Sequence, residues 1–195
     1  MTDYSQPDFY HFNEDSIRLV RFAVERATLS PKKIADFGAG CGIIGIELAR
    51  RLKPLSVNFV EAQQEFLPHL EENLRLFMPS ETSSNIFHGS FSQCPWDGFN
   101  FDLILCNPPF YLPGHGQLAK DPRKQVCRSF ELDSWDILLD LTKRNLAQKG
   151  EAHFVLPSSD KLLGMIQERV HAMGLIVEMF PDGKISYLSV RLNKN

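Results

Sequence analysis

The sequence predicts one α/β domain in which helices cover both faces of a mostly parallel β-sheet. Short, almost continuously apolar runs alternate along the chain with segments of helical spacing, and a turn signal separates the last two runs. The 195 residues, 43% of them hydrophobic, suit one domain with its own core. We expect a single domain over 1–195, with an N-terminal segment and helix over 1–30 and an α/β core over 31–195.

Apolar runs of about four to six residues predict the strands. The runs ahead of the C-terminal pair are Ile34–Phe37, Val57–Val60, Asn85–His88, Phe101–Cys106 and Ala152–Leu156. Leu175–Phe180 and Ile185–Leu192 flank the turn Pro181–Gly183, so these two strands are expected to form an antiparallel hairpin.

Helical spacing of apolar residues fills the intervals between the runs. Asn13 predicts the cap of a first helix, and Pro68 suits only the first turn of another. Asp133 or Ser134 is expected to cap a later helix, and Ser158–Ser159 the last one. The apolar faces contain Ile17, Val20 and Val24; Leu67, Leu70, Leu74 and Phe77; Trp135, Leu138, Leu139 and Leu146; and Leu162, Leu163, Ile166, Val170 and Met173.

Composition excludes several protein classes. The 21 basic and 24 acidic residues give a net charge of −3, so charge alone does not indicate a nucleic-acid binder. The four cysteines form no CxxC pair, which argues against zinc or a redox dithiol, and we expect no metal. No signal peptide or membrane-spanning run is present. A cytoplasmic protein without membrane association, either a monomer or a weak dimer, is expected.

A glycine-rich turn, Asp36–Gly45, joins the first strand to a helix. Gly38, Gly40 and Gly42 permit a tight turn and let backbone N–H groups approach a ligand. Gly40–Gly45 alone also matches the GxGxxG pattern of dinucleotide-binding proteins, which is a weak signal. A nicotinamide-dependent oxidoreductase therefore stays open as an alternative.

Two acidic residues favour S-adenosylmethionine (SAM) over a dinucleotide. Asp36 stands immediately before the turn, where a carboxylate would repel a pyrophosphate but attract the ammonium of a methionine group. Glu61, at the end of the second run, is placed to accept hydrogen bonds from a ribose diol. Because Glu61 suits either ligand, Asp36 is the discriminating residue.

The tetrapeptide Asn107–Phe110 follows the fourth run and is the candidate catalytic segment. An amino group attached to a π-system is a poor nucleophile, and the Asn107 oxygen can accept one of its N–H bonds. Pro108 stiffens a segment that offers carbonyls for the other N–H, and Phe110 offers a ring for stacking. These residues predict methyl transfer from SAM, with S-adenosyl-L-homocysteine as the product.

These motifs resemble those of class I SAM-dependent amino-methyltransferases. The resemblance rests on Asp36–Gly42, Glu61 and Asn107–Phe110; with Tyr10–Ser16 and Cys127–Glu131 it extends to bacterial tRNA(Val) adenine-N6 methyltransferases. It implies a Rossmann-like sheet of seven strands, the last antiparallel. It also implies a catalytic role for Asn107, a stacking role for Phe110, and tRNA as the partner.

Two departures from this family pattern concern ligand contacts. The family more often has Tyr where Phe110 stands, which removes a hydroxyl but keeps a stacking ring. Many members have Asp where Ser90 stands, to hold the adenine amine of the cofactor. Here Ser90 can accept one hydrogen bond, and Phe91 is expected to contribute to holding the adenine.

A local basic segment is the candidate RNA contact. It contains Lys120, Arg123, Lys124 and Arg128 just beyond the catalytic tetrapeptide, where these side chains could touch phosphates that flank a target base. The leading expectation is adenine-N6 methylation in tRNA. Protein glutamine N5-methylation and rRNA guanine-N2 methylation remain alternatives that use the same segment, and a non-catalytic RNA-binding module is a further one.

Overall fold

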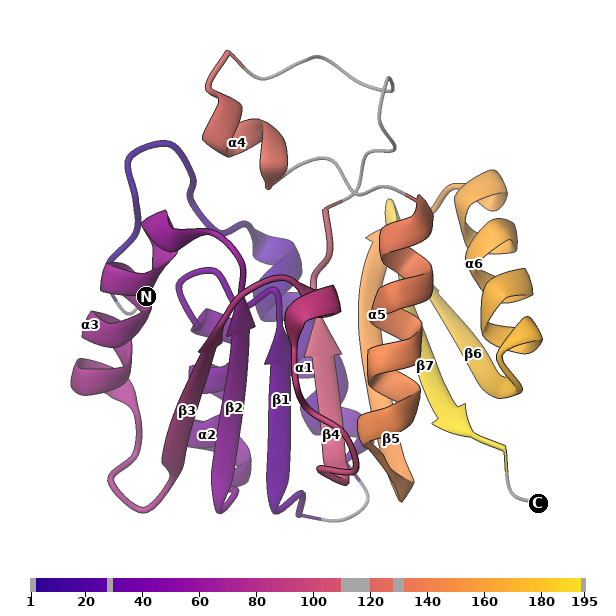
Figure 1. Cartoon of the computed structure of the whole chain (residues 1–195), viewed down its shortest axis with the longest axis horizontal. Helices are drawn as coiled ribbons and strands as arrows, with labels where there is room; N and C mark the ends of the chain where they lie inside the picture. Colours follow the sequence, from indigo (N-terminus) through magenta and orange to yellow (C-terminus); the bar gives the residue numbers. More distant parts are fainter. Residues whose placement is uncertain (1–2, 28–29, 110–119, 128–131, 194–195) are drawn as a thin grey trace.

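The computed structural model describes residues 3–27, 30–109, 120–127 and 132–193. These form three layers, with a seven-stranded sheet between two layers of helices (Figure 1). The strand order is β3-β2-β1-β4-β5-β7-β6. The strands are β1 (Lys33–Phe37), β2 (Ser56–Glu61), β3 (Ser83–His88), β4 (Phe101–Cys106), β5 (Leu146–Pro157), β6 (Leu175–Asp182) and β7 (Ile185–Leu192). The pairs from β3 to β5 are parallel, and β7 is antiparallel to both neighbours. The predicted mostly parallel sheet with an antiparallel C-terminal hairpin is confirmed.

Helices cover both faces of this sheet, as predicted (Figure 1). The longer helices are α1 (Glu14–Arg26), α2 (Ile43–Leu52), α3 (Leu67–Phe77), α5 (Leu132–Asn145) and α6 (Asp160–Ala172). Shorter turns of helix are η1 (Gln64–Phe66), η2 (Phe91–Gln93) and α4 (Pro122–Val126). One hydrophobic core lies between the sheet and α1 to α3, and a second between the sheet and α5 and α6.

The strands contribute to both cores because successive side chains point to opposite faces. Along β4, Leu103 and Leu105 join the first core, while Ile104 and Cys106 join the second. This two-sided burial explains why the strands read as continuous apolar runs rather than as alternating ones.

Several element boundaries differ from the sequence prediction: β2, β3 and β6 extend beyond their predicted runs, and β5 and α5 begin earlier. Strand β5 begins at Leu146, well before the predicted run, so Leu146 does not lie on the helix where we predicted it. The β4–β5 register shifts there, and a Cβ on Gly150 would lie 2.6 Å from the Phe101 carbonyl oxygen. Glycine therefore permits a close backbone approach that hydropathy does not show. Helix α5 begins at Leu132, ahead of the predicted caps Asp133 or Ser134.

Residues 3–12, here called the N-terminal strap, lie ahead of α1 and pack against the α2–α3 side of the molecule. Tyr4 is buried, and its hydroxyl donates to Glu47 Oε1 at 2.7 Å. The buried Asn73 of α3 accepts from the Ser5 N–H at 2.8 Å and donates to the Ser5 carbonyl at 2.9 Å. The strap is thus tied into the fold by both apolar and polar contacts.

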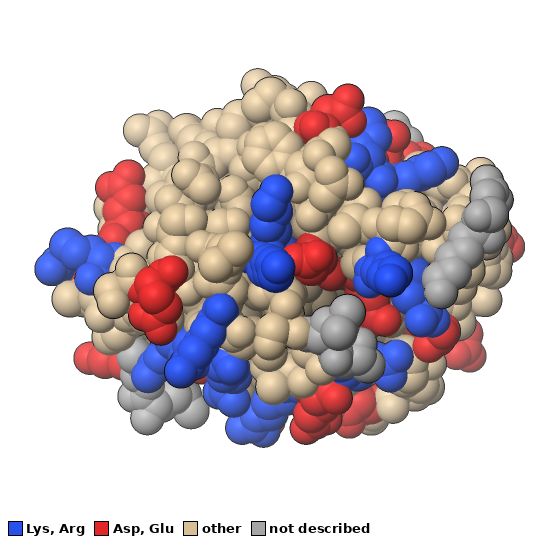
Figure 2. Space-filling view, turned by 90° about the horizontal axis from the view of Figure 1, so that it is seen from below, with Lys and Arg blue, Asp and Glu red and all other residues tan. Residues whose placement is uncertain are grey.

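The surface at the amino ends of the parallel strands carries charges of both signs. Figure 2 looks at this end from below and shows Lys and Arg interspersed with Asp and Glu over its described part. Its described residues present no broad patch of one sign, so this end gives no reason to place an anionic partner here. None of the helices in the described ranges is long and apolar enough to cross a membrane.

Candidate active site

A pocket of about 350 Å³ lies at the opposite end of the sheet, beyond the carboxyl ends of β1, β2 and β4. The strand order reverses beside β1, because β2 and β3 continue to one side and β4 lies on the other. This reversal is where open α/β sheets bind ligands. The pocket volume is within the range of small-molecule sites.

The glycine-rich turn forms one wall of the pocket. The Gly38 and Ala39 N–H groups donate to the Val60 carbonyl, each at 2.9 Å, which ties the turn to β2. Gly38 and Gly40 have φ angles of +70° and +54° and line the pocket. Glycine is favoured at both positions because it adopts positive φ without strain and leaves the backbone accessible.

Gly42 lies outside the described pocket wall, although we predicted a cofactor-binding role for it. It precedes α2, and a Cβ at this position would lie 2.4 Å from Leu70 Cδ1. Its contribution is therefore close packing of the turn against α3.

Asp36 also lies outside the pocket wall. Its side chain is fully buried, and its Oδ2 atom accepts from the Gly45 N–H at 2.9 Å, near the start of α2. Its Oδ1 atom has no hydrogen-bond partner among the described residues. The structure therefore places Asp36 beneath the glycine-rich turn, where it accepts from the backbone of α2, and not among the residues that line the pocket.

Burial gives Asp36 an unusual titration. Loss of solvent raises the pKa of Asp36 to about 7, a smaller lowering effect coming from the Gly45 N–H and a further rise from Glu61. Between about pH 4 and 7 the folded chain holds this proton more strongly than the unfolded chain. The Asp36 contribution to stability is therefore present below pH 4 and is lost as the pH rises to 7.

Replacement of Asp36 by asparagine should remove this pH dependence. We compare the free energy of unfolding of Asp36→Asn with that of wild type. As the pH rises from 4 to 7, this difference should shift in favour of Asp36→Asn by up to ~4 kcal/mol, and above pH 7 it should stay constant. Urea unfolding at a series of pH values measures the gap, with the exposed Asp97→Asn as the matched control. A gap that stays flat for Asp36→Asn would contradict the prediction.

Glu61 lies at the carboxyl end of β2 and lines the pocket. It is 6% exposed, and its two carboxylate oxygens accept from the Gly40 N–H at 2.6 Å and from the Gln63 N–H at 2.7 Å. Burial raises its pKa, and these backbone N–H groups oppose that rise. Each oxygen keeps a second lone-pair site, so the carboxylate can still accept hydroxyl groups from a ligand.

The loop after β3 brings Ser90 and Phe91 to the pocket, as predicted. The Ser90 hydroxyl is already within hydrogen-bonding distance of Ser92 Oγ and Gln93 Oε1, at 2.9 and 3.0 Å. The Ser90 N–H also donates to Gln93 Oε1 at 3.0 Å. Because the Ser90 side chain is engaged in capping η2 and Ser92 Oγ is paired with it, the Phe91 ring is the better candidate for a ligand contact.

The catalytic candidates Asn107 and Pro108 line the same pocket, directly after β4. Asn107 Nδ2 donates to Ser16 Oγ at 3.0 Å, and the described residues provide no donor that pairs with Asn107 Oδ1. Phe110, the predicted stacking residue, lies outside the described residues. The glycine-rich turn, Glu61 and Asn107 therefore face one common space.

The predicted basic segment is only partly available to a partner. Lys120 and Lys124 are exposed, and Arg128 lies outside the described residues. Arg123 donates to both carboxylate oxygens of Asp121, at 3.1 and 2.7 Å. The two exposed lysines are thus the described side chains best placed to meet phosphates.

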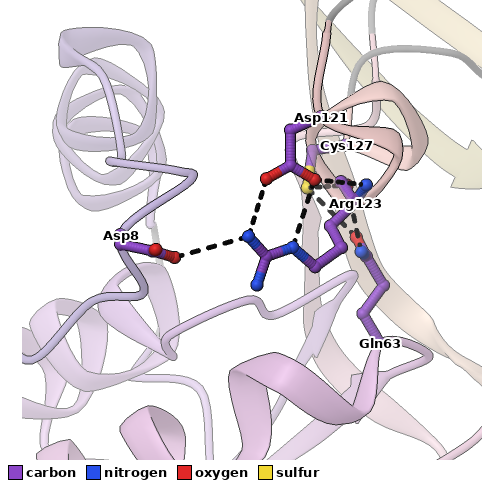
Figure 3. A network of polar contacts seen from close by, with 5 residues as sticks. All are labelled: Asp8, Gln63, Asp121, Arg123 and Cys127. Atoms are coloured by element: carbon purple, nitrogen blue, oxygen red, sulfur yellow. Dashed lines mark hydrogen bonds and ion pairs between the residues drawn. The ribbon is translucent and has the colours of Figure 1, made fainter.

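Arg123 instead holds α4 against the rest of the pocket (Figure 3). Its guanidinium lies 3.7 Å from Asp8 Oδ1 and 4.4 Å from the centre of the Phe9 ring, both in the N-terminal strap. Gln63 Nε2 donates to the Arg123 carbonyl at 3.1 Å, and Cys127 Sγ donates to Gln63 Oε1 at 3.0 Å. Arg123 therefore joins three segments that are far apart in sequence.

Sequence reasoning missed several residues that the structure places at the pocket, namely Gln63, Phe66, Val126, Cys127 and Ile137. For Tyr10, which also lines the pocket, the sequence left open whether the N-terminal aromatic residues cover the cofactor site or pack on the sheet edge. Tyr10 and Phe66 pack edge to face, with ring centroids 5.6 Å apart. The cluster of aromatic residues near the N-terminus was the signal for Tyr10, whereas Gln63 and Ile137 have no distinctive pattern around them.

Comparison of the chain with known proteins agrees with this geometry. The structure resembles a ribosomal protein L11 methylase from Lactobacillus delbrueckii subsp. bulgaricus, with a TM-score of 0.66 and 22% identity over 94% of this chain and 81% of that one. It also resembles a putative RNA methyltransferase from Pyrococcus horikoshii, with a TM-score of 0.69 and 17% identity over 98% and 92% of the two chains. The fold is therefore that of the Rossmann-like class I methyltransferases.

The family follows from the sequence comparison. The model of the methyltransferase small domain matches residues 19–173, and the chain belongs to this family. A tRNA1(Val) (adenine(37)-N6)-methyltransferase from Tolumonas auensis is 33% identical over 129 residues, or 65% of this chain and 52% of the relative. The protein of that name from Vibrio vulnificus strain YJ016 is 26% identical over 66% and 52%. The chain thus spans about half the length of the curated relatives it matches.

Proposed function

We propose that this chain is a SAM-dependent N-methyltransferase that acts on an exocyclic amino group of a nucleobase, namely adenine N6 in tRNA. One observation carries the proposal: Gly38, Glu61 and Asn107 line the same pocket, although they come from three different strand ends. A glycine turn and a strand-end carboxylate suit an adenosyl ligand, and a carboxamide beside them suits a planar amino group.

The residues present fit SAM. Gly38 leaves its pocket side open, because a Cβ there would meet only Phe91 Cζ, at 3.9 Å. Glu61 would accept the ribose hydroxyls, and the Phe91 ring offers an apolar surface for the adenine. When bound, SAM supplies an electrophilic methyl group on a positively charged sulfur.

On the acceptor side, Asn107 and Pro108 position the nucleophile. Asn107 Oδ1 accepts one N–H of the target amine, which raises electron density on its nitrogen and holds it in one orientation. Pro108 is buried and lacks an N–H, so the segment presents carbonyl acceptors in a stiff backbone. We extend the predicted stacking role to Phe110.

The choice of tRNA adenine rests on the relatives and on local charge. Two relatives that match this chain over 129 residues carry the name tRNA1(Val) (adenine(37)-N6)-methyltransferase. In this chain the exposed Lys120 lies just before α4 and the exposed Lys124 lies within it, and Val126 of the same helix lines the pocket. A nucleotide in a single-stranded anticodon loop also costs less to extrude than one within a duplex.

The test is transfer of labelled methyl groups from SAM to purified tRNA, followed by nucleoside mass spectrometry. We expect label in N6-methyladenosine of tRNA. Parallel reactions with rRNA and with a protein fraction examine the alternative acceptors. Label that appears in N2-methylguanosine or only in protein would contradict the adenine proposal, and loss of transfer to every acceptor would contradict the methyltransferase proposal itself.

A further inference from the structure

One polar contact joins two segments that lie far apart in the sequence. Asn107 Nδ2 donates to Ser16 Oγ at 3.0 Å across a separation of 91 residues. Ser16 lies in the first turn of α1 and is 6% exposed. Asn107 directly follows β4 at the pocket wall. The contact therefore links a helix outside the pocket to the residue that we place beside the acceptor amine.

The planarity of a carboxamide gives this contact its importance. Nδ2 and Oδ1 lie on opposite sides of the same planar group, so a partner that holds Nδ2 also fixes where Oδ1 points. Without such a partner, the carboxamide could rotate about its Cβ–Cγ bond, and Oδ1 would no longer be held opposite the amine. Because a serine hydroxyl both donates and accepts, the contact fixes the plane of the carboxamide, and the N–H of the bound amine favours the orientation with Oδ1 toward it.

Ser16 is itself held firmly. The neighbouring residues Leu19 and Val20 of α1 are fully buried in the core that α1 forms with the sheet. A side chain on a packed helix has little freedom to follow movements of the loop after β4. Ser16 is thus a fixed reference for the Asn107 carboxamide.

We propose that Ser16 is a positioning residue that orients the Asn107 carboxamide so that Oδ1 faces the acceptor amine. This inference rests on the proposed function. It assigns Ser16 no contact with either substrate, and it predicts that Ser16 influences the methyl-transfer step through Asn107 and not the binding of SAM.

The test uses Ser16→Ala, Ser16→Thr and the matched control Ser186→Ala. Ser186 is also buried, and its hydroxyl forms one hydrogen bond, with Ser158 Oγ at 2.8 Å, outside the pocket wall. We expect Ser16→Ala to lower kcat about 10- to 100-fold, with the dissociation constant of SAM within about twofold of wild type. Ser16→Thr should recover most of the rate, and Ser186→Ala should keep it.

A double-mutant cycle separates positioning from general destabilisation. In the Asn107→Ala background, Ser16→Ala should cause no additional loss of rate, because Ser16 acts only through Asn107. An additional loss there, or a Ser16→Ala rate equal to wild type, would overturn the inference. If Ser16→Ala does not fold, Ser16→Cys replaces it; the weak acceptor should give a slow enzyme, and a wild-type rate would overturn the inference.

The two proposals fail in different ways. A wild-type protein that methylates no RNA rejects the proposed function, and this is measured before any variant. A wild-type protein that methylates tRNA at the same rate as Ser16→Ala rejects the role of Ser16 alone.

Discussion

Replacement of Asn107 by alanine is expected to lower the rate of methyl transfer by about 10²- to 10³-fold, which is the usual cost of removing one oriented hydrogen-bond partner from a transition state. Asn107 lines the pocket directly after β4, and its Nδ2 is already paired with Ser16. The loss should appear in kcat, because the acceptor contact strengthens as the amine gives up electron density to the methyl group.

The binding of SAM separates this effect from misfolding. Titration calorimetry should give Asn107→Ala a dissociation constant for SAM within a few-fold of wild type, since Glu61 and the glycine-rich turn remain. Asn85→Ala is the matched control, because Asn85 donates one side-chain hydrogen bond, to Asn58 Oδ1 at 3.1 Å, outside the pocket wall. Asn107→Ala with a wild-type rate would remove Asn107 from the chemistry.

The sequence predicts the sheet well because its strands are buried on both faces. A strand that is buried on both faces appears in the sequence as a continuous apolar run, and this run can be located without knowing which strands lie beside it. The β6–β7 hairpin was also predictable, since Pro181–Gly183 signals a turn, although Pro181 and Asp182 still pair within β6 and the chain reverses at Gly183 and Lys184. The early start of β5 was not, because it depends on Gly150 lying against the Phe101 carbonyl, which is a contact between strands.

The candidate site was predictable where a residue follows directly on a strand end. Glu61 and Asn107 each stand at such a position, and both line the pocket. Asp36, unlike Glu61 and Asn107, does not line the pocket. Side chains alternate between the two faces of a strand, and this alternation, not the distance of Asp36 from the turn, decides where its side chain points. It lies under the turn with its Oδ2 on the Gly45 N–H. Ser16 was not predicted, because its contact with Asn107 exists only after folding.

The basic segment shows a further limit of reading charge from sequence. Arg123 counts as one positive charge among its neighbours, yet its partners Asp8 and Asp121 come from the N-terminal strap and from the start of α4. A charge sum over a window includes Asp121 but omits Asp8. A positive side chain that already has two acidic partners has less to offer a phosphate than an unengaged one.

Replacement of Glu61 by glutamine is expected to weaken SAM binding by about 10- to 100-fold. The two carboxylate oxygens accept from the Gly40 and Gln63 N–H groups, and a glutamine side chain can accept from only one of them. Its NH₂ group would face the other donor and would no longer accept from the ribose. Loss of a charge-assisted acceptor and displacement of the turn both reduce affinity.

The stability of the free protein should respond much less, which makes the prediction specific. Burial is the largest cause of the raised pKa of Glu61, so glutamine removes a costly buried charge at the same time as it removes a hydrogen bond. In the unliganded chain, removal of the buried charge raises stability and removal of the hydrogen bond lowers it. Both changes weaken the binding of SAM. Calorimetric titration with SAM and urea unfolding measure the two quantities, with the exposed Glu65→Gln in η1 as the control. If Glu61→Gln binds SAM as tightly as Glu65→Gln does, the carboxylate serves only to tie the glycine-rich turn to β2.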